Sequence, residues 1–157
     1  MPIPFLHKFL SAATRGGFEQ QPEMVNSHAW PLSLVGMDGP QLLRFNIMGI
    51  GETAPRKAGI FIYARRLNKD WRALYIGESA NLCTRLSFNE IAADALLSGA
   101  TDIHIMQLDA DANTRRNLAE RLIATNRPSL NEEERIHLKP ISQGRRPPQT
   151  KGKTQAA

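Results

Sequence analysis

The chain of 157 residues contains a single cysteine, Cys83. One cysteine excludes an internal disulfide framework and any metal site built from several thiolates, and the reducing cytoplasm is the expected compartment. No window holds the roughly 18 consecutive apolar residues that a membrane-spanning helix needs, so no membrane contact is expected. The four histidines are scattered without metal-ligand spacing, and there is no glycine-rich loop of the P-loop or dinucleotide type.

Acidic residues are missing from the end of the chain. No Asp or Glu follows Arg135, whereas five Lys and Arg residues do. The 15 basic residues up to Arg135 balance the 15 acidic ones, so the net charge of +5 comes from residues 136–157. This segment is predicted to be disordered because it cannot bury enough apolar surface. Its positive charge favours sequence-independent attraction to phosphate.

Apolar patterning predicts a β-sheet. Two runs rich in β-branched and aromatic residues, Gly59–Ala64 and Ala73–Gly77, are separated by a polar connection and predict an antiparallel hairpin. The alternating segment Thr101–Leu108 predicts a third strand. Ala29–Val35 and Leu42–Ile50 also have strand character, with turn residues between them, and predict an additional hairpin near the N-terminus.

Helices are predicted to follow these strands. One begins after Ser79, a second covers residues 87–97 and ends at Gly99, and a third runs from Asn113 or Thr114 to Asn126. The predicted fold class is therefore α+β, with a three-stranded antiparallel core sheet that is flanked by helices and extended by the N-terminal hairpin. The expected divisions of the chain are an N-terminal segment over residues 1–55, a core domain over 56–135 and a basic tail over 136–157.

Several short motifs, taken in order, resemble those of the GIY-YIG nuclease superfamily. Tyr75-Ile76-Gly77 matches the second tripeptide, and Arg85 follows Tyr75 by ten residues, at the spacing of the family's catalytic arginine. Gly59-Ile60-Phe61 occupies the first tripeptide with Phe in place of Tyr. Arg127–Asn131 looks like the family's closing proline-to-asparagine segment. The resemblance covers Ala58 to Asn131 and implies the small α+β fold of that family.

The resemblance also implies hydrolysis of DNA phosphodiester bonds with a Mg or Mn ion. In this family a glutamate holds the ion, tyrosines position the water and an arginine binds the phosphate. Tyr75 then becomes the tyrosine near the water, and Arg85 becomes the phosphate ligand. Asn131 would touch the substrate, orient the last loop or act as a turn residue. Tyr63 faces the same side of its strand as Phe61 and is the candidate for the missing first tyrosine.

The metal-binding glutamate is the main departure from the family pattern. Twelve residues before Asn131, where the resemblance places this glutamate, the sequence has Ala119. On a helix, Ala119 lies at the centre of the apolar face, whereas its neighbour Glu120 points away from that face toward Arg116. Two carboxylates remain as candidate metal ligands: Glu120, after a one-residue shift of the helix, and Glu78, directly after the second tripeptide.

The predicted tip of the central hairpin adds a candidate nucleic-acid contact. Arg65 and Arg66 lie there together with Trp71 and Arg72. Arginines beside an aromatic residue are typical of surfaces that bind a nucleic-acid backbone. Hairpin tips are also commonly polar without such a role, and the expectation of DNA or another nucleic acid as the partner rests on the resemblance and on the basic tail.

Three functions stay open from the sequence. The first is a divalent-metal-dependent endonuclease, which Tyr75, Arg85 and Asn131 favour. The second is a catalytically impaired module of the same fold that binds nucleic acid or a protein partner without cleavage, which Phe61 and Ala119 favour. The third is a structural role in a larger assembly, with the basic tail as the anchor.

Overall fold

The computed structural model describes residues 26–33, 39–87 and 89–138, which form five strands and four helices. The N-terminal 25 residues, part of the predicted first turn and the basic tail from Lys139 onward lie outside the described residues. The strands are β1 (Ser27–Leu32), β2 (Gln41–Gly49), β3 (Gly59–Leu67), β4 (Asp70–Ser79) and β5 (Asp102–Gln107). The helices are α2 (Leu82–Ser87), α3 (Glu90–Leu97), α4 (Ala112–Asn126) and α5 (Ser129–Leu138).

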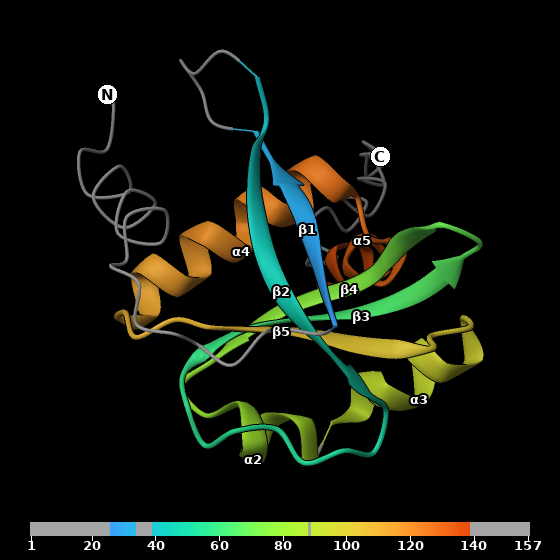
Figure 1. Ribbon diagram of the computed structural model, residues 1–157, viewed down its shortest axis with the longest axis horizontal. Helices are drawn as coiled ribbons and strands as arrows, with labels where there is room; N and C mark the ends of the chain where they lie inside the picture. The colour runs from blue at the N-terminus through green and yellow to red at the C-terminus, as the bar shows by residue number, and fades with distance from the viewer. Residues whose placement is uncertain (1–25, 34–38, 88, 139–157) are drawn as a thin grey trace, which may run out of the picture.

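The strands form one antiparallel sheet in the order β1-β2-β5-β3-β4 (Figure 1). The predicted α+β class is confirmed, and β1 and β2 form an antiparallel pair as expected. Strand β3 lies between β5 and β4, and β4 is an edge strand. None of the helices in the described part of the chain is long and apolar enough to cross a membrane.

The β3–β4 hairpin is longer than the two apolar runs predicted. Pairing continues to Leu67 and Asp70, so that only Asn68 and Lys69 form the turn. Asn68 has a φ of 49°, a left-handed conformation that Asn adopts more readily than most residues. The charged segment predicted as a connection is therefore strand. The charged side chains of the hairpin tip are exposed, so they do not oppose backbone pairing.

A β-bulge interrupts the pairing of β3 with β4. Tyr63 pairs with Tyr75 and Ala64 pairs with Ala73, which leaves Leu74 as the extra residue on β4. Leu74 and Tyr75, although adjacent in the chain, consequently pack on the same side of the sheet. The bulge thus groups Tyr75 with Tyr63 and leaves Ala73 on the opposite face.

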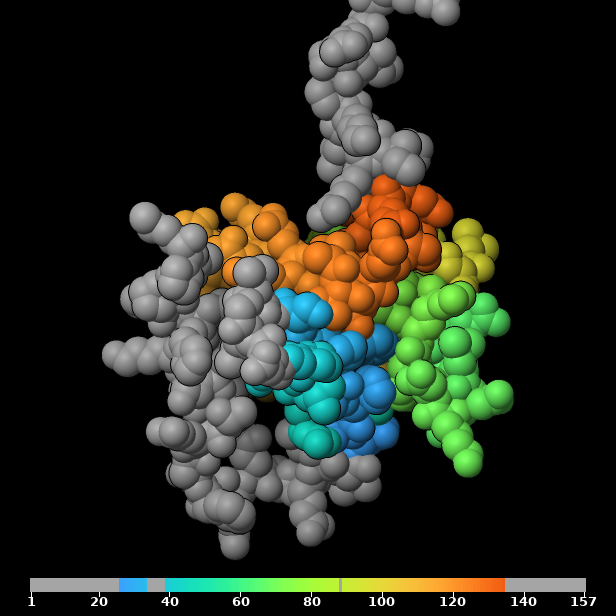
Figure 2. All heavy atoms as spheres, turned by 90° about the horizontal axis from the view of Figure 1, so that it is seen from above, coloured from blue at the N-terminus to red at the C-terminus, as the bar shows by residue number. Residues whose placement is uncertain are grey.

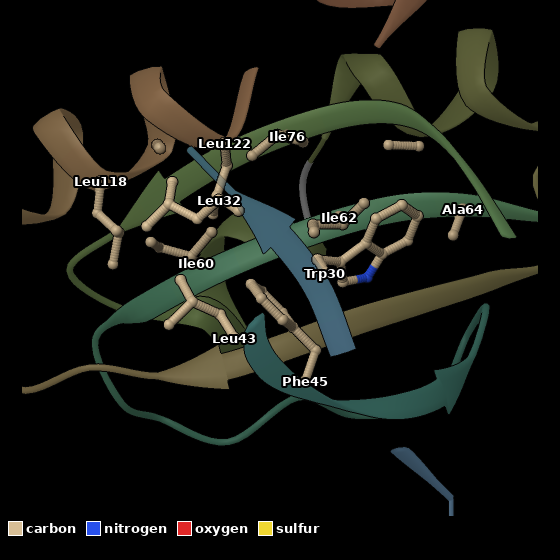
Figure 3. Close-up of a cluster of buried hydrophobic side chains, with 12 residues drawn as sticks. Trp30, Leu32, Leu43, Phe45, Ile60, Ile62, Ala64, Ile76, Leu118 and Leu122 are labelled. Carbon is tan, nitrogen blue, oxygen red and sulfur yellow. The ribbon is translucent and has the colours of Figure 1, made fainter. Parts of the chain in front are cut away.

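One face of the sheet is covered by α4 and by β1 and β2, which cross over β3 because the sheet is strongly curled (Figure 1). Helix α4 packs its apolar side here, with Leu118, Ala119 and Leu122 buried and Glu120 exposed, as its helical spacing predicts. Figure 3 shows the resulting cluster. Its buried members are Trp30, Leu32, Leu43, Phe45, Ile60, Ile62, Ala64, Ala73, Ile76, Leu118, Ala119 and Leu122.

Helices α2 and α3 cover the other face (Figure 1). Local capping sets the two ends of α3. Helix α3 begins after Asn89, whose side chain accepts a hydrogen bond from the Ile91 backbone, and the chain turns at Gly99 with a φ of 91°, as predicted. The buried members of this second cluster are Met48, Ala54, Phe61, Tyr63, Leu74, Tyr75, Leu82, Ala95, Ile103, Ile105 and Leu130.

Two boundaries near the C-terminal helices differ from the prediction. Helix α4 is capped by Asp111, whose carboxylate accepts a hydrogen bond from Thr114 N at 2.7 Å, and not by Asn113 or Thr114. The segment after Pro128, expected as a loop, is helix α5, which Leu130 anchors in the core. The boundary placed after residue 135 falls inside this helix.

A buried histidine belongs to the α4-side core. Trp30 Nε1 donates a hydrogen bond to His104 Nδ1 at 3.0 Å, so the proton of the neutral imidazole lies on Nε2, which has no hydrogen-bond partner among the described residues. The Trp71 ring packs edge-on at 4.5 Å between centroids. Burial, together with the neighbouring His28, lowers the pKa of His104 to about 4.

We predict that His104 makes the fold sensitive to acid. The unfolded chain takes up this proton near the ordinary pKa of 6.5, whereas the folded protein takes it up only near 4. The free energy of unfolding should therefore fall as the pH drops from 6.5 to 4, with His104 contributing on the order of 3 kcal/mol. Urea unfolding across this range should show a shallower pH dependence for His104→Asn, in which Asn Oδ1 can still accept from Trp30. Parallel pH profiles would contradict the prediction.

Candidate functional site

The motif residues gather on the α2–α3 face of the sheet. The Phe61 ring lies 6.1 Å from the Tyr63 ring and 6.0 Å from the Tyr75 ring, between centroids. Arg85, in the last turn of α2, holds its guanidinium carbon 5.9 Å from the Phe61 ring centre. The structure thus brings Phe61, Tyr63, Tyr75 and Arg85 together, as the sequence predicts.

Gly77 makes this aromatic packing fit. It lies opposite Phe61 in the β3–β4 register, and a Cβ atom at Gly77 would collide with the Phe61 ring. The conformation of Gly77 is ordinary for a strand, so the requirement for glycine comes from space and not from backbone strain. Gly77, in the second tripeptide, therefore leaves room for the ring of Phe61, in the first tripeptide.

Tyr75 meets a carboxylate that sequence reasoning missed. The Tyr75 hydroxyl donates to Glu134 Oε2 across 3.4 Å, at the long end for such a bond. Burial raises the pKa of Tyr75, the Glu134 carboxylate raises it further, and the Arg85 guanidinium lowers it in part. Tyr75 is therefore a neutral phenol at neutral pH and acts as a hydrogen-bond donor. Only recognition of helix α5 could have found Glu134, which lies three residues after Asn131.

Tyr63 has a supporting position in the site. Its side chain is almost fully buried, with a relative exposure of 1%. Asn89 Nδ2 donates a hydrogen bond to the Tyr63 hydroxyl at 3.1 Å. Burial raises the pKa of Tyr63, while the Asn89 hydrogen bond and Arg85 lower it in part. Tyr63 therefore links the sheet to the start of α3. Its hydroxyl is hydrogen-bonded to Asn89 and is shielded from solvent.

Asn131 binds the backbone of the edge strand β4. Its Oδ1 accepts a hydrogen bond from Ile76 N at 2.8 Å, and its Nδ2 donates to the Ile76 carbonyl at 2.9 Å. Asn131 is 5% exposed, so these contacts are shielded from water. They fasten α5 beside Tyr75. Of the roles considered for Asn131, this geometry supports the one that organises the last segment.

The two carboxylates predicted as metal ligands lie away from Tyr75. Glu78 points to the α4 side, where its Oε2 is 2.9 Å from Arg115 Nε. Arg115 is itself buried and also donates to the Ala110 carbonyl. Glu120 is exposed on α4, which covers the opposite face of the sheet. Neither carboxylate converges on Tyr75 and Arg85.

The hairpin arginines do not act as one group. Arg65 pairs with Arg72 and shares the face of Tyr63, whereas Arg66 pairs with Trp71 on the α4 side. The guanidinium of Arg66 lies 5.7 Å from the Trp71 ring centre, in a cation–π contact. Of the two hairpin arginines predicted to bind substrate, Arg65 and Arg66, only Arg65 faces the same way as the tyrosines.

The donor set fits a divalent ion only in part. Among the described residues there is no group of three or more His, Cys, Asp or Glu side chains that could hold a metal ion. Glu134 is the carboxylate that contacts Tyr75. Mg²⁺ is commonly held by one or two carboxylates, several waters and the phosphate oxygens of its substrate. Glu134 therefore fits such an ion when a substrate phosphate supplies further oxygens.

Comparison of the chain with protein-family models, curated proteins and solved structures finds no match in any of the three. The resemblance to the GIY-YIG superfamily therefore rests on the motif residues alone, and a function has to be proposed from their geometry.

We predict that Asn131→Ala destabilises the fold by about 2–3 kcal/mol, because the substitution leaves a buried backbone donor and a buried backbone acceptor of Ile76 without partners. Urea unfolding measures the loss. Asn117→Ala, which truncates an exposed Asn on α4, is the matched control and should change stability by less than about 0.5 kcal/mol. Equal stability of the two variants would show that the Ile76 contact contributes nothing.

We predict that Ala119→Glu does not restore a metal site. The new carboxylate would enter the apolar cluster under α4, on the face opposite Tyr75, and would destabilise the fold by about 3–5 kcal/mol. Ala124→Glu, at an exposed position of the same helix, should be nearly neutral. Thermal unfolding of both variants tests this, and a fully stable Ala119→Glu protein would contradict the placement of α4.

Proposed function

We propose that this protein is an endonuclease-like protein of the GIY-YIG type that binds the phosphodiester backbone of DNA on the α2–α3 face and hydrolyses it with a divalent ion. The observation that carries the proposal is the convergence of Arg85, Tyr75 and Glu134 around one point of the sheet. The adjacency of strands β5, β3 and β4 in the sheet supports the proposal, because the resemblance implies a three-stranded antiparallel core.

Arg85 is suited to hold the phosphate. No carboxylate among the described residues lies within ion-pair distance of its guanidinium. Its planar fork can therefore give two parallel hydrogen bonds to phosphate oxygens. In this position it would also stabilise the negative charge that develops on the phosphate during attack by water.

Tyr75 and Glu134 would supply the remaining polar groups. Tyr75 keeps its proton at neutral pH and directs it to the Glu134 carboxylate, which fixes the orientation of that carboxylate. Glu134 would hold the Mg or Mn ion together with phosphate oxygens of the substrate. When bound, such an ion polarises the phosphate and lowers the pKa of a bound water.

Binding without cleavage is the second candidate function. Phe61 occupies the position of the family's first tyrosine, is fully buried and has no hydroxyl. The described residues bring one carboxylate to Tyr75, and Ala119 leaves the expected acidic position without an acid. A site with these two losses would retain the arginine that binds phosphate and lose turnover.

Nicking of supercoiled plasmid in Mg²⁺ or Mn²⁺ separates the two candidates. The parent protein should produce nicked circles, and Arg85→Ala and Glu134→Gln should each lower the rate by about 100-fold or more. Glu133→Gln removes the neighbouring exposed carboxylate of α5 and should cut like the parent. Circular dichroism melts would establish that all four proteins are folded.

Binding of a fluorescein-labelled DNA duplex, followed by anisotropy, completes the test. Binding that weakens in Arg85→Ala, without nicking by the parent in either metal, would leave the non-catalytic module as the function. Binding and nicking that are both unchanged in Arg85→Ala would overturn the proposed site.

A further inference from the structure

Two arginines face each other across the β3–β4 hairpin. Arg65 and Arg72 are directly paired in the strand register, and both side chains are exposed. Like charges at directly opposed positions destabilise a sheet. No carboxylate among the described residues forms an ion pair with either guanidinium. An anionic ligand that lies across both arginines would offset this repulsion, and it would account for their direct pairing.

This arginine pair belongs to the face of the candidate site. Side chains alternate along a strand, so Arg65 lies on the side of Tyr63 and Phe61. The Arg65 side chain also passes beside Gly99, at the end of α3, which covers that face. Arg66, its neighbour in the chain, lies on the other side over Trp71.

The arginine pair and Arg85 lie on the same side of the sheet, at different positions along β3. Arg85 lies against Phe61, and Arg65 follows Phe61 by four residues on β3, which places the two charged ends about 13 Å apart along the strand. A nucleic-acid strand carries one phosphate per nucleotide, so a backbone that runs in this direction can place different phosphates at the two ends. The hairpin tip projects from the rest of the described chain (Figures 1 and 2), and Arg65 and Arg72 are exposed on it.

We propose that Arg65 and Arg72 form a second phosphate-binding site, and that a nucleic-acid backbone runs along the β3–β4 hairpin from Arg85 toward its tip. The inference rests on the proposed function for the Arg85 end of the path. It assigns the hairpin contact to Arg65 and Arg72 and excludes Arg66 from it. The ligand is recognised through its phosphates and not through its bases.

The salt dependence of binding tests the assignment. The full-length protein, Arg65→Ala, Arg72→Ala and the control Arg66→Ala are titrated into a fluorescein-labelled DNA duplex over a range of KCl concentrations. Removing a phosphate contact should lower the slope of log K against log[salt] by about 1. Arg65→Ala and Arg72→Ala should each show this loss, whereas Arg66→Ala, which removes the same charge from the opposite face, should keep the parent slope.

Stability provides an independent readout. Removing one member of a like-charged pair should leave the melting temperature of Arg72→Ala equal to or above that of the parent, although the variant binds DNA less tightly. A structural role for Arg72 would instead lower the melting temperature and leave the salt slope unchanged. That result would overturn the proposal.

The outcomes also separate this inference from the proposed function. If Arg85→Ala abolishes binding and nicking while Arg65→Ala and Arg72→Ala keep the parent salt slope, the nuclease-like site stands and the second phosphate site is refuted. If the salt slope depends on Arg65 and Arg72 while Arg85→Ala binds like the parent and nothing is nicked, the second site stands and the proposed function fails. Equal losses in all three hairpin variants would indicate attraction by net charge alone and would refute the path.

Discussion

The hydrogen-bond pair between the Asn131 amide and the Ile76 backbone is the contact on which the site depends. Strand β4 is an edge strand, and an edge strand buried under a helix leaves backbone donors and acceptors that need partners. One side-chain amide supplies both a donor and an acceptor, and it satisfies Ile76 on both counts. The same contact fixes α5 against β4, and Glu134, one turn further along α5, therefore meets Tyr75. The resemblance places Asn131 near the chemistry. In this structure Asn131 acts indirectly, because it fixes the positions of β4 and α5 and so of Tyr75 and Glu134.

The β-bulge at Leu74 decides which side chains share a face. Ala73, before the bulge, faces α4, whereas Leu74 and Tyr75 both face α2 and α3, and Ile76 returns to the α4 side. Glu78 lies beyond Tyr75 on the α4 side and pairs with Arg115. Helix α4, where the resemblance expects an acidic residue, packs its side chains into a hydrophobic cluster on that same side (Figure 3). A carboxylate that reaches Tyr75 must therefore come from another element, and α5 provides one.

The sequence predicts features that depend on neighbouring residues in the chain, and it does not predict features that depend on contacts between distant segments. Alternation and β-propensity predict all five strands, and helical spacing predicts that Ala119 is buried and Glu120 exposed on α4. Helix α5 was missed because three consecutive glutamates after Pro128 resemble a solvated turn, and its stability comes from tertiary contacts of Leu130 and Asn131. For the same reason the sequence points to Glu78, adjacent to the motif, and gives no signal for Glu134, which is 59 residues from Tyr75 in the chain.

The two faces of the sheet differ in whether their arginines contact a partner side chain. On the α4 side, Arg115 is buried and needs the Glu78 carboxylate, because an unpaired charge in that position would be costly. Arg66 on the same side lies over the Trp71 ring. Arg65, Arg72 and Arg85 on the α2–α3 side form no ion pair with the described carboxylates. The basic and acidic residues up to Arg135 are equal in number, so it is the placement of these three arginines, and not the net charge, that provides positions for an anion. A phosphate backbone would neutralise these arginines, and their attraction to it does not require the basic tail.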